Sequence, residues 1–191
     1  MQSAVPVGIG AMAAILGLDD VQVIEICSQS NSLGVVEAVN FNSPGQVVIA
    51  GEKEAVNGAC EVMKNAGAKR ALVLPVSVPS HCSLMTNAAQ DFAESVDMVN
   101  FKIGNVDVLH NVDASVAEDV TEIKSKLVEQ LHKPVLWTSS VQKMQQLGIE
   151  KIVELGPGKV LAGLTRRIDR SLSASAVIDT TTLHSTIEEI R

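Results

Sequence analysis

The first 76 residues alternate extended and helical patterns in the order β-α-β-β-α-β, and this order restricts the fold more than any other feature of the sequence. Short runs rich in Val, Ile and Ala predict strands, whereas apolar residues recurring at three- and four-residue spacing predict helices. We expect strands at residues 10–18, 35–41, 46–51 and 70–76, and helices at residues 19–30 and 52–66.

Turn-forming residues separate these elements. The sequence Asn42-Ser43-Pro44-Gly45 predicts a tight turn between the second and third strands, and Gly67 is expected to end the second helix. The order of the six elements is that of the ferredoxin-like motif. We therefore expect residues 7–76 to form a ferredoxin-like subdomain.

Residues 77–191 continue the alternation of helix and strand, which is typical of an α/β protein with a mainly parallel sheet. Helices are expected at residues 83–96, 117–132, 138–147 and 159–170 with a short one at the C-terminus, and strands at residues 106–110, 151–155 and 174–179. A parallel sheet needs neighbours and cover on both faces. Three short strands give an incomplete layer, so we expect part of this second domain to be missing.

Composition indicates a globular chain and argues against several functional classes. Hydrophobic residues make up 46% and charged residues 19% of the 191 residues, which suits a packed core. The net charge of −7 argues against broad nucleic-acid binding. No apolar run approaches the roughly 20 residues of a membrane helix, and no signal peptide is evident. The three cysteines match neither a disulfide framework nor a metal site, so we expect reduced thiols, a cytoplasmic location, and no metal or cofactor.

His81 is the strongest candidate for a chemical role. It lies in Pro79-Ser80-His81-Cys82, between an extended segment and the start of a helix, where loops held by rigid elements often carry catalytic side chains. Imidazole is the commonest general acid or base near neutral pH. The plainer interpretation is a surface or structural histidine, which describes most single histidines. Cys82 is expected to pack at the helix start rather than to form a Cys–His pair.

Two other loops have both a plain and a functional interpretation. Residues 40–46 are rich in turn formers, which is a sufficient explanation, although their amide side chains could also point into a cleft. Residues 156–159, Gly-Pro-Gly-Lys, are explained by a tight turn, and an anion site at a helix N-terminus is the alternative. The sequence has no Gly-x-Ser-x-Gly, GxGxxG, HExxH or EF-hand motif.

Five strings in a fixed order resemble one protein family. They are VNFNSPGQVVIAG (residues 39–51), AGAKRALVLPVSVPSHCSLM (66–85), HNVD (110–113), LVEQLHKPVLWTSSV (127–141) and VELGPGKVLAGLTRRI (153–168). Their order and spacing resemble the malonyl-CoA:acyl carrier protein transacylases, the bacterial enzymes that load fatty acid synthase. The resemblance spans nearly the whole chain. It implies an α/β-hydrolase-like acyltransferase core, partial here in residues 77–191, with the ferredoxin-like subdomain inserted into it.

The resemblance also implies roles for individual residues in a ping-pong reaction through an acyl-serine. His81 matches the catalytic histidine, which takes a proton from the serine and then from the phosphopantetheine thiol. Gln130 matches the residue whose main-chain carbonyl orients that histidine, and Asn42 matches an active-site asparagine. Ser80, in the same motif as His81, is expected to contact the substrate. The implied reaction moves malonyl from malonyl-CoA to acyl carrier protein.

Basic residues are expected to meet the acidic carrier protein, because complementary charge raises the rate of encounter. Arg166 and Arg167 match family residues proposed for this contact. Lys69 and Arg70 form a second small basic spot, which we assign to partner binding as well.

The chain departs from the family in three respects. It has no GHSLGE-type serine elbow, no GQGSQ-type oxyanion loop, and no arginine for the malonyl carboxylate, which the family places just before Met1. We therefore expect Met1 to be an internal methionine of a longer enzyme and the isolated chain to be inactive. The alternatives are a polyketide-synthase-type acyltransferase domain and a non-enzymatic ferredoxin-like binding module, and the missing serine favours the latter.

Overall fold

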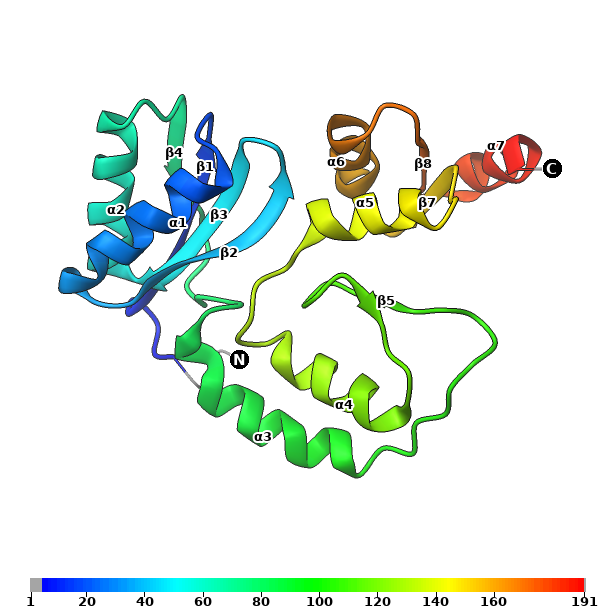
Figure 1. Cartoon of the computed structure of the whole chain (residues 1–191), viewed down its shortest axis with the longest axis horizontal. Coiled ribbons are helices and arrows are strands. Elements are labelled where there is room, and N and C mark those ends of the chain that lie inside the picture. Colours follow the sequence, from blue (N-terminus) through cyan, green and yellow to red (C-terminus); the bar gives the residue numbers. More distant parts are fainter. Residues whose placement is uncertain (1–4, 191) are drawn as a thin grey trace. The chain divides into compact units, whose positions relative to one another are not determined.

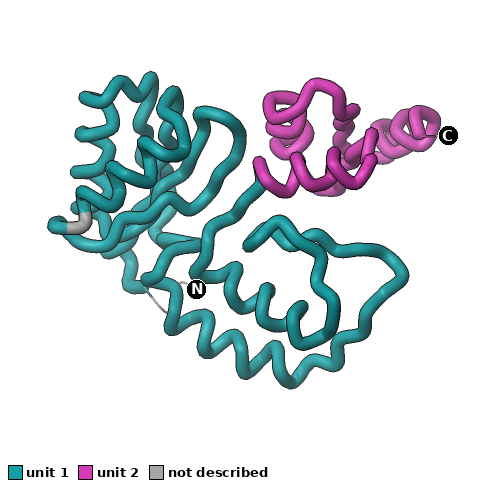
Figure 2. The backbone as a smooth tube through the Cα atoms, in the orientation of Figure 1, with its two compact units in different colours: residues 1–137 teal, residues 138–191 magenta. Residues whose placement is uncertain are grey.

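The computed structural model describes residues 5–190, with only the backbone described at Asn31. Internal contacts divide the chain into two compact units, Met1–Trp137 and Thr138–Arg191 (Figure 2). Both units contain helices and strands, in agreement with the predicted α/β class. This division by contacts falls at a different place from our boundary between residues 76 and 77, which stays a prediction.

The first unit is built around a four-stranded sheet in the order β2-β3-β1-β4 (Figure 1). Every neighbouring pair is antiparallel, and the strands are β1 (Gly10–Leu16), β2 (Val36–Ser43), β3 (Gln46–Glu52) and β4 (Arg70–Val73). Helix α1 (Asp20–Gln29), continued by the short helix η1 (Ser30–Leu33), follows β1, and helix α2 (Lys53–Asn65) follows β3. The predicted order of the six main elements is therefore confirmed.

The two faces of this sheet bury different partners, because successive side chains of a strand point to opposite faces. On β1, Ala13 and Ile15 pack with buried side chains of α1 and α2. The side chain of Met12, which lies between Ala11 and Ala13 on β1, points to the opposite face and packs there with Cys82. The face away from the helices thus carries the segment around residue 82.

Three strand ends of this sheet differ from the expectation by two residues or more, and the first is that of β1, which ends at Leu16 rather than at residue 18. β2 continues to Ser43, so Asn42 lies in the strand and the turn is reduced to Pro44 and Gly45, the latter at a φ of 71°. Proline followed by glycine at positive φ is the signature of a type II turn, for which two central residues suffice. β4 ends at Val73, shortly before a proline that has no N–H to give to the sheet.

The rest of the first unit consists of helices and a small hairpin. After the short helix η2 (Ser83–Met85), the elements are α3 (Thr86–Asp97), β5 (Leu109–His110), β6 (Ser115–Val116) and α4 (Val120–Glu129). Helices α3 and α4 pack against each other (Figure 1). The strand predicted at residues 106–110 is wrong in extent and partner, since only two residues are extended and they pair antiparallel with β6. Ala114 in the hairpin turn has a φ of 55°, which alanine rarely adopts and the pattern did not predict.

The second unit pairs β7 (Lys151–Leu155) with β8 (Ser173–Val177) in parallel. Helix α5 (Trp137–Gln146) leads into β7, α6 (Val160–Ile168) connects the two strands, and α7 (Thr180–Ile190) follows β8. Within the described residues, these two strands pair only with each other. The expected parallel sheet of three strands is therefore reduced to two.

Candidate functional site

His81 lies in a strained turn that makes two hydrogen bonds to one partner segment. Its φ of 68° is in the left-handed region, which residues other than glycine rarely adopt and which recurs at functional sites. The His81 N–H donates to the carbonyl of Leu131 (3.1 Å), and Nδ1 lies 2.6 Å from the carbonyl oxygen of Gln130. Both the backbone and the side chain of this residue are therefore attached to the segment that follows α4.

The contact with Gln130 fixes which ring nitrogen of His81 carries a proton. A carbonyl oxygen can only accept, so Nδ1 donates and Nε2 of the neutral ring keeps a free lone pair. Gln130 is the C-cap of α4, at the helix end where carbonyls lack partners within the helix. Its side-chain Nε2 donates to the carbonyls of Lys133 and Pro134 (both 3.2 Å), which holds the following loop. The half-buried imidazole is thereby oriented as a proton acceptor.

The outer edge of β2 holds the same loop. The Val135 N–H donates to the carbonyl of Val39 (2.8 Å), and the Phe41 N–H donates to the carbonyl of Val135 (3.0 Å). Asn42 follows directly in β2, at an irregularity of the strand register. The structure thus brings His81 and Gln130 into contact and links Asn42 to their loop through the backbone. A role for the Asn42 amide stays a prediction.

Ser80 and Cys82 flank the histidine. Ser80 is half-buried and its N–H donates to the carbonyl of Val78 (2.9 Å), while its expected contact with substrate remains untested. Cys82 is buried, and its Sγ–H donates to the carbonyl of Pro79 (3.1 Å). Burial raises the pKa of Cys82 to about 11, so the side chain is a neutral thiol at pH 7. This environment fits a packed residue rather than a Cys–His pair.

Glu37 is a residue of this site that the sequence analysis missed. It lies on β2, and its carboxylate accepts hydrogen bonds from Oγ (2.5 Å) and N–H (3.1 Å) of Ser83, two residues after His81. The available signal was that Glu37 is the one charged residue in the strand predicted at residues 35–41. A charged side chain within a strand packed on a core calls for a polar partner.

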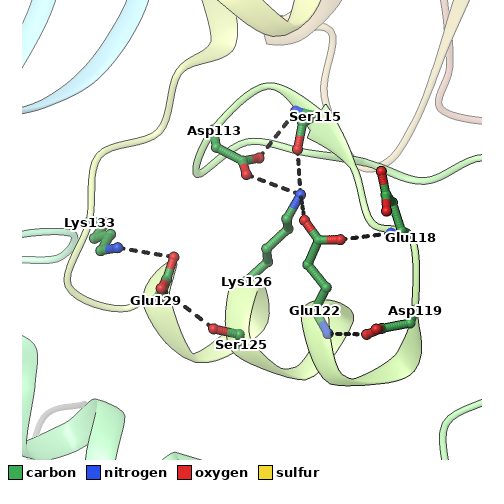
Figure 3. Close-up of polar contacts among 9 residues, drawn as sticks. All are labelled: Asp113, Ser115, Glu118, Asp119, Glu122, Ser125, Lys126, Glu129 and Lys133. Atoms are coloured by element: carbon green, nitrogen blue, oxygen red, sulfur yellow. Dashed lines mark hydrogen bonds and ion pairs between the residues drawn. The ribbon is translucent and has the colours of Figure 1, made fainter.

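A buried lysine ties α4 to the β5–β6 hairpin (Figure 3). Lys126 Nζ lies 3.0 Å from Asp113 Oδ2 and 2.8 Å from Glu122 Oε1, and it donates to Ser115 Oγ. The Lys126 carbonyl accepts the N–H of Gln130 (3.0 Å). The cluster therefore anchors the helix one turn before the residue that holds the histidine.

The charges of this cluster support one another. Burial would raise the pKa of Asp113, but hydrogen bonds from Lys126 and Ser115 outweigh it and lower that pKa. The pKa of Glu122 is lowered by the hydrogen bond from the Glu118 N–H and then by that from Lys126. Burial would lower the pKa of Lys126, yet its bonds to the two carboxylates raise it. All three groups are therefore held in their charged forms near neutral pH.

The basic residues predicted to meet a partner belong to different units. Arg166 and Arg167 are exposed in the last turn of α6, where positive charge is favourable. Arg166 Nη2 donates to the carbonyl of Ala174 in β8 (2.5 Å), so its guanidinium also holds the helix to the strand. Lys69 and Arg70 are exposed at the start of β4. Partner binding by these four residues remains a prediction.

The turn at residues 156–159 is arranged as a helix start rather than as an anion site. Glu154 Oε2 accepts the N–H of Ala162 in the first turn of α6 (2.8 Å). A carboxylate at this helix N-terminus already satisfies a donor that a bound anion would use. The tight-turn interpretation is therefore favoured.

Metal and membrane features are not found in the part of the chain that the structure describes. Residues 5–190 hold no group of three His, Cys, Asp or Glu side chains placed to bind a metal ion. None of the described helices is long and apolar enough to cross a membrane.

Curated relatives match the chain along almost all of its length. The malonyl CoA-acyl carrier protein transacylase of Haemophilus influenzae is 51% identical over 189 residues, which cover 99% of this chain and 60% of that protein. The transacylase of Bacillus subtilis is 41% identical over 192 residues, covering 100% of this chain and 61% of that protein. No protein-family model matches.

Solved structures give the same result. A malonyl-transacylase in complex with a type II polyketide synthase acyl-carrier protein has a TM-score of 0.96 and 48% identity, covering 98% of this chain and 61% of its own. The acyl-carrier-protein S-malonyltransferase of Burkholderia pseudomallei has a TM-score of 0.96 and 49% identity over the same shares. The resemblance inferred from the five sequence strings is confirmed. The chain is thus a homologue of the malonyl CoA-acyl carrier protein transacylases that spans about 60% of their length.

Proposed function

We propose that the chain provides the general base of a malonyl-CoA:acyl carrier protein transacylase, with His81 as the base and the Gln130 carbonyl as its orienting partner. The observation that carries this proposal is the 2.6 Å contact between Nδ1 and that carbonyl oxygen, because it leaves Nε2 free to accept a proton. Homology to transacylases along the chain supports it. In this proposal, the nucleophilic serine comes from sequence outside these 191 residues.

The proposed reaction has two proton transfers in each half. A serine hydroxyl attacks the thioester carbonyl of malonyl-CoA while His81 Nε2 takes its proton, which then goes to the departing sulfur of coenzyme A. In the second half, Nε2 takes the proton of the phosphopantetheine thiol, the sulfur attacks malonyl-serine, and the proton returns to the serine oxygen. The Gln130 carbonyl stabilises each imidazolium through Nδ1–H, as an aspartate does in a serine triad.

Other residues complete the proposed site. We assign Ser80 to substrate contact and the Asn42 side-chain amide to the active site. Exposed basic side chains are proposed to attract the acidic carrier protein and to raise the rate of encounter, an effect that added salt weakens; they are Lys69, Arg70, Arg166 and Arg167.

Thioester exchange between malonyl-CoA and acyl carrier protein tests this function. The isolated chain is expected to show no turnover. Fused behind the serine-bearing segment of the Haemophilus influenzae relative, it is expected to transfer malonyl, and His81→Ala should lower the rate about 10²–10⁴-fold. His184→Ala, which removes an exposed histidine of α7, is the matched control. Near-normal transfer by His81→Ala would mean that the base is misassigned.

The finer description of the fold is part of this proposal. We propose that residues 7–76 are a ferredoxin-like subdomain, supported by the antiparallel sheet order β2-β3-β1-β4, and that residues 77–191 are part of an α/β-hydrolase-like acyltransferase core. We place the protein in the cytoplasm. A cooperative unfolding transition of residues 7–76 expressed alone is expected, and an unfolded segment would contradict the boundary.

A polyketide-synthase-type acyltransferase is the second candidate, because one similar structure holds a type II polyketide synthase carrier protein. Transfer rates of the fused protein onto carrier proteins of the two pathways separate these readings. Tight carrier-protein binding without any transfer, even with the serine segment supplied, would instead favour a non-enzymatic binding module.

A further inference from the structure

Glu37 holds the turn that follows His81 at two points. Its carboxylate accepts the Ser83 hydroxyl at 2.5 Å and the Ser83 N–H at 3.1 Å. Ser83 begins the short helix η2, so the N–H is one that has no partner within the helix. A carboxylate that accepts two hydrogen bonds from one residue fixes its position and orientation, because charge-assisted bonds are the stronger ones.

The left-handed backbone of His81 needs this kind of support. Such a conformation persists only where the surrounding structure over-determines it. Before the histidine, Pro79 is fully buried, and its carbonyl accepts a hydrogen bond from the Cys82 thiol. After the histidine, the Glu37–Ser83 pair holds the chain. The strained residue is therefore held on both sides.

Strand β2 also holds the loop that carries the hydrogen-bond acceptor of His81. Val39 and Phe41 bond to Val135, in the loop that starts at Gln130. Glu37, Val39 and Phe41 lie in one strand, at most about 14 Å apart at roughly 3.4 Å per residue. The two segments that meet in the Nδ1–Gln130 contact are thus attached to the same rigid strand.

We propose that Glu37 is a positioning residue, which fixes the His81 turn against β2 so that Nδ1 meets the Gln130 carbonyl and Nε2 is left as the base. The catalytic consequence of this positioning rests on the proposed function. Its structural consequence, the tautomer of the His81 imidazole, is measurable in the 191-residue chain.

The test compares Glu37→Ala, Glu37→Gln and Ser83→Ala with Glu25→Ala, which removes an exposed glutamate of α1. Nitrogen-15 spectra of the imidazole report the tautomer, and amide exchange reports the His81 N–H. We expect Glu37→Ala to change the single Nδ1–H tautomer into a mixture and to speed exchange at His81 about tenfold or more, since hydrogen bonds to a charged group are lost. Glu37→Gln, which keeps an acceptor, should rescue part of both effects, and Glu25→Ala should match the wild type.

The amides of Ala13 and Ile49, in the centre of the sheet, report whether each variant is folded. If Glu37→Ala unfolds the chain, the comparison of Ser83→Ala with Glu25→Ala decides. Wild-type tautomer and exchange in the folded Glu37 and Ser83 variants would overturn the proposal. A changed tautomer in the Glu37 variants together with unimpaired transfer by the fused His81→Ala protein would leave Glu37 as a positioning residue and overturn the proposed function. A wild-type tautomer in those variants together with impaired transfer by the fused His81→Ala protein would overturn the role of Glu37 and leave the proposed function standing.

Discussion

The Nδ1 proton of His81 is received by a main-chain atom, so the path of the backbone at residue 130 matters more than its side chain. Gln130→Ala keeps the carbonyl and removes the side-chain bonds to Lys133 and Pro134. We expect an unchanged His81 tautomer and a free energy of unfolding lower by about 1 kcal/mol. Denaturant unfolding and imidazole spectra check this, and loss of the Nδ1–H signal would contradict the role given to the carbonyl.

The three cysteine thiols should be unreactive in the folded chain. Burial raises the pKa of Cys27 to about 12 and that of Cys82 to about 11, and it also raises that of Cys60. Because the thiolate is the reactive form, we expect almost no alkylation by iodoacetamide at pH 8 in the native chain, and full alkylation in denaturant. Mass spectrometry measures both. Rapid labelling of native Cys82 would show that it is not packed as described.

At this scale, local sequence identified only part of the site. His81 could be nominated because it lies between an extended segment and a helix start. Gln130 came from family resemblance alone, since it meets His81 across 49 positions of sequence. Glu37 was missed because its partner Ser83 is 46 positions away and no local pattern connects them. Contacts across such separations are made by the tertiary fold, which composition and periodicity do not specify.

The ion pairs of Lys126 make helix α4 sensitive to acid. The folded-state pKa values of Asp113 and Glu122 are lowered, so their stabilisation is present above the unfolded values near about 4 and is lost as pH falls through the folded ones. Protonation then leaves a buried ammonium without counter-charge. Hydrogen exchange should therefore show α4 losing protection below about pH 4 while sheet β1–β4 keeps it.

Lys126→Met identifies the source of that acid response. With the ammonium replaced by an apolar side chain of similar length, the extra loss of protection in α4 at low pH should shrink or vanish. Lys102→Met, which removes an exposed lysine, is the control. The same acid response in both variants would place its origin elsewhere.

Strands and helices with a clear hydrophobic period were predicted well, whereas short strands that form mainly through pairing with a neighbouring strand were not. The strands and helices of the first sheet carry their own periodicity, and their order was correct. β5 and β6 have two residues each, and the turn between them contains Ala114 at a positive φ. A sequence pattern has no period to detect in so short an element.

For the whole molecule, the two units should differ in stability. The sheet of the first unit has a core on both faces. In the second unit, β7 and β8 form a two-stranded parallel pair, and Leu155 at the end of β7 and Val160 at the start of α6 are 77% and 68% exposed. We expect amides of residues 7–76 to exchange more slowly than those of residues 138–191 in the isolated chain. Equal protection throughout would contradict this.

The two edge strands of the first sheet, β2 and β4, differ in what covers them, and this difference affects how copies of the chain associate at high protein concentration. The outer side of β2 is bonded to the Val135 loop, whereas β4 is the last strand of the sheet within the described residues. An open strand edge is a template for a second molecule, and cationic side chains on it oppose such addition. Lys69 and Arg70 stand where β4 begins, beside exposed Leu72 and Val73. Replacing both cations by serine should increase light scattering with protein concentration, so the same pair that we assign to partner capture would also keep copies of the chain apart.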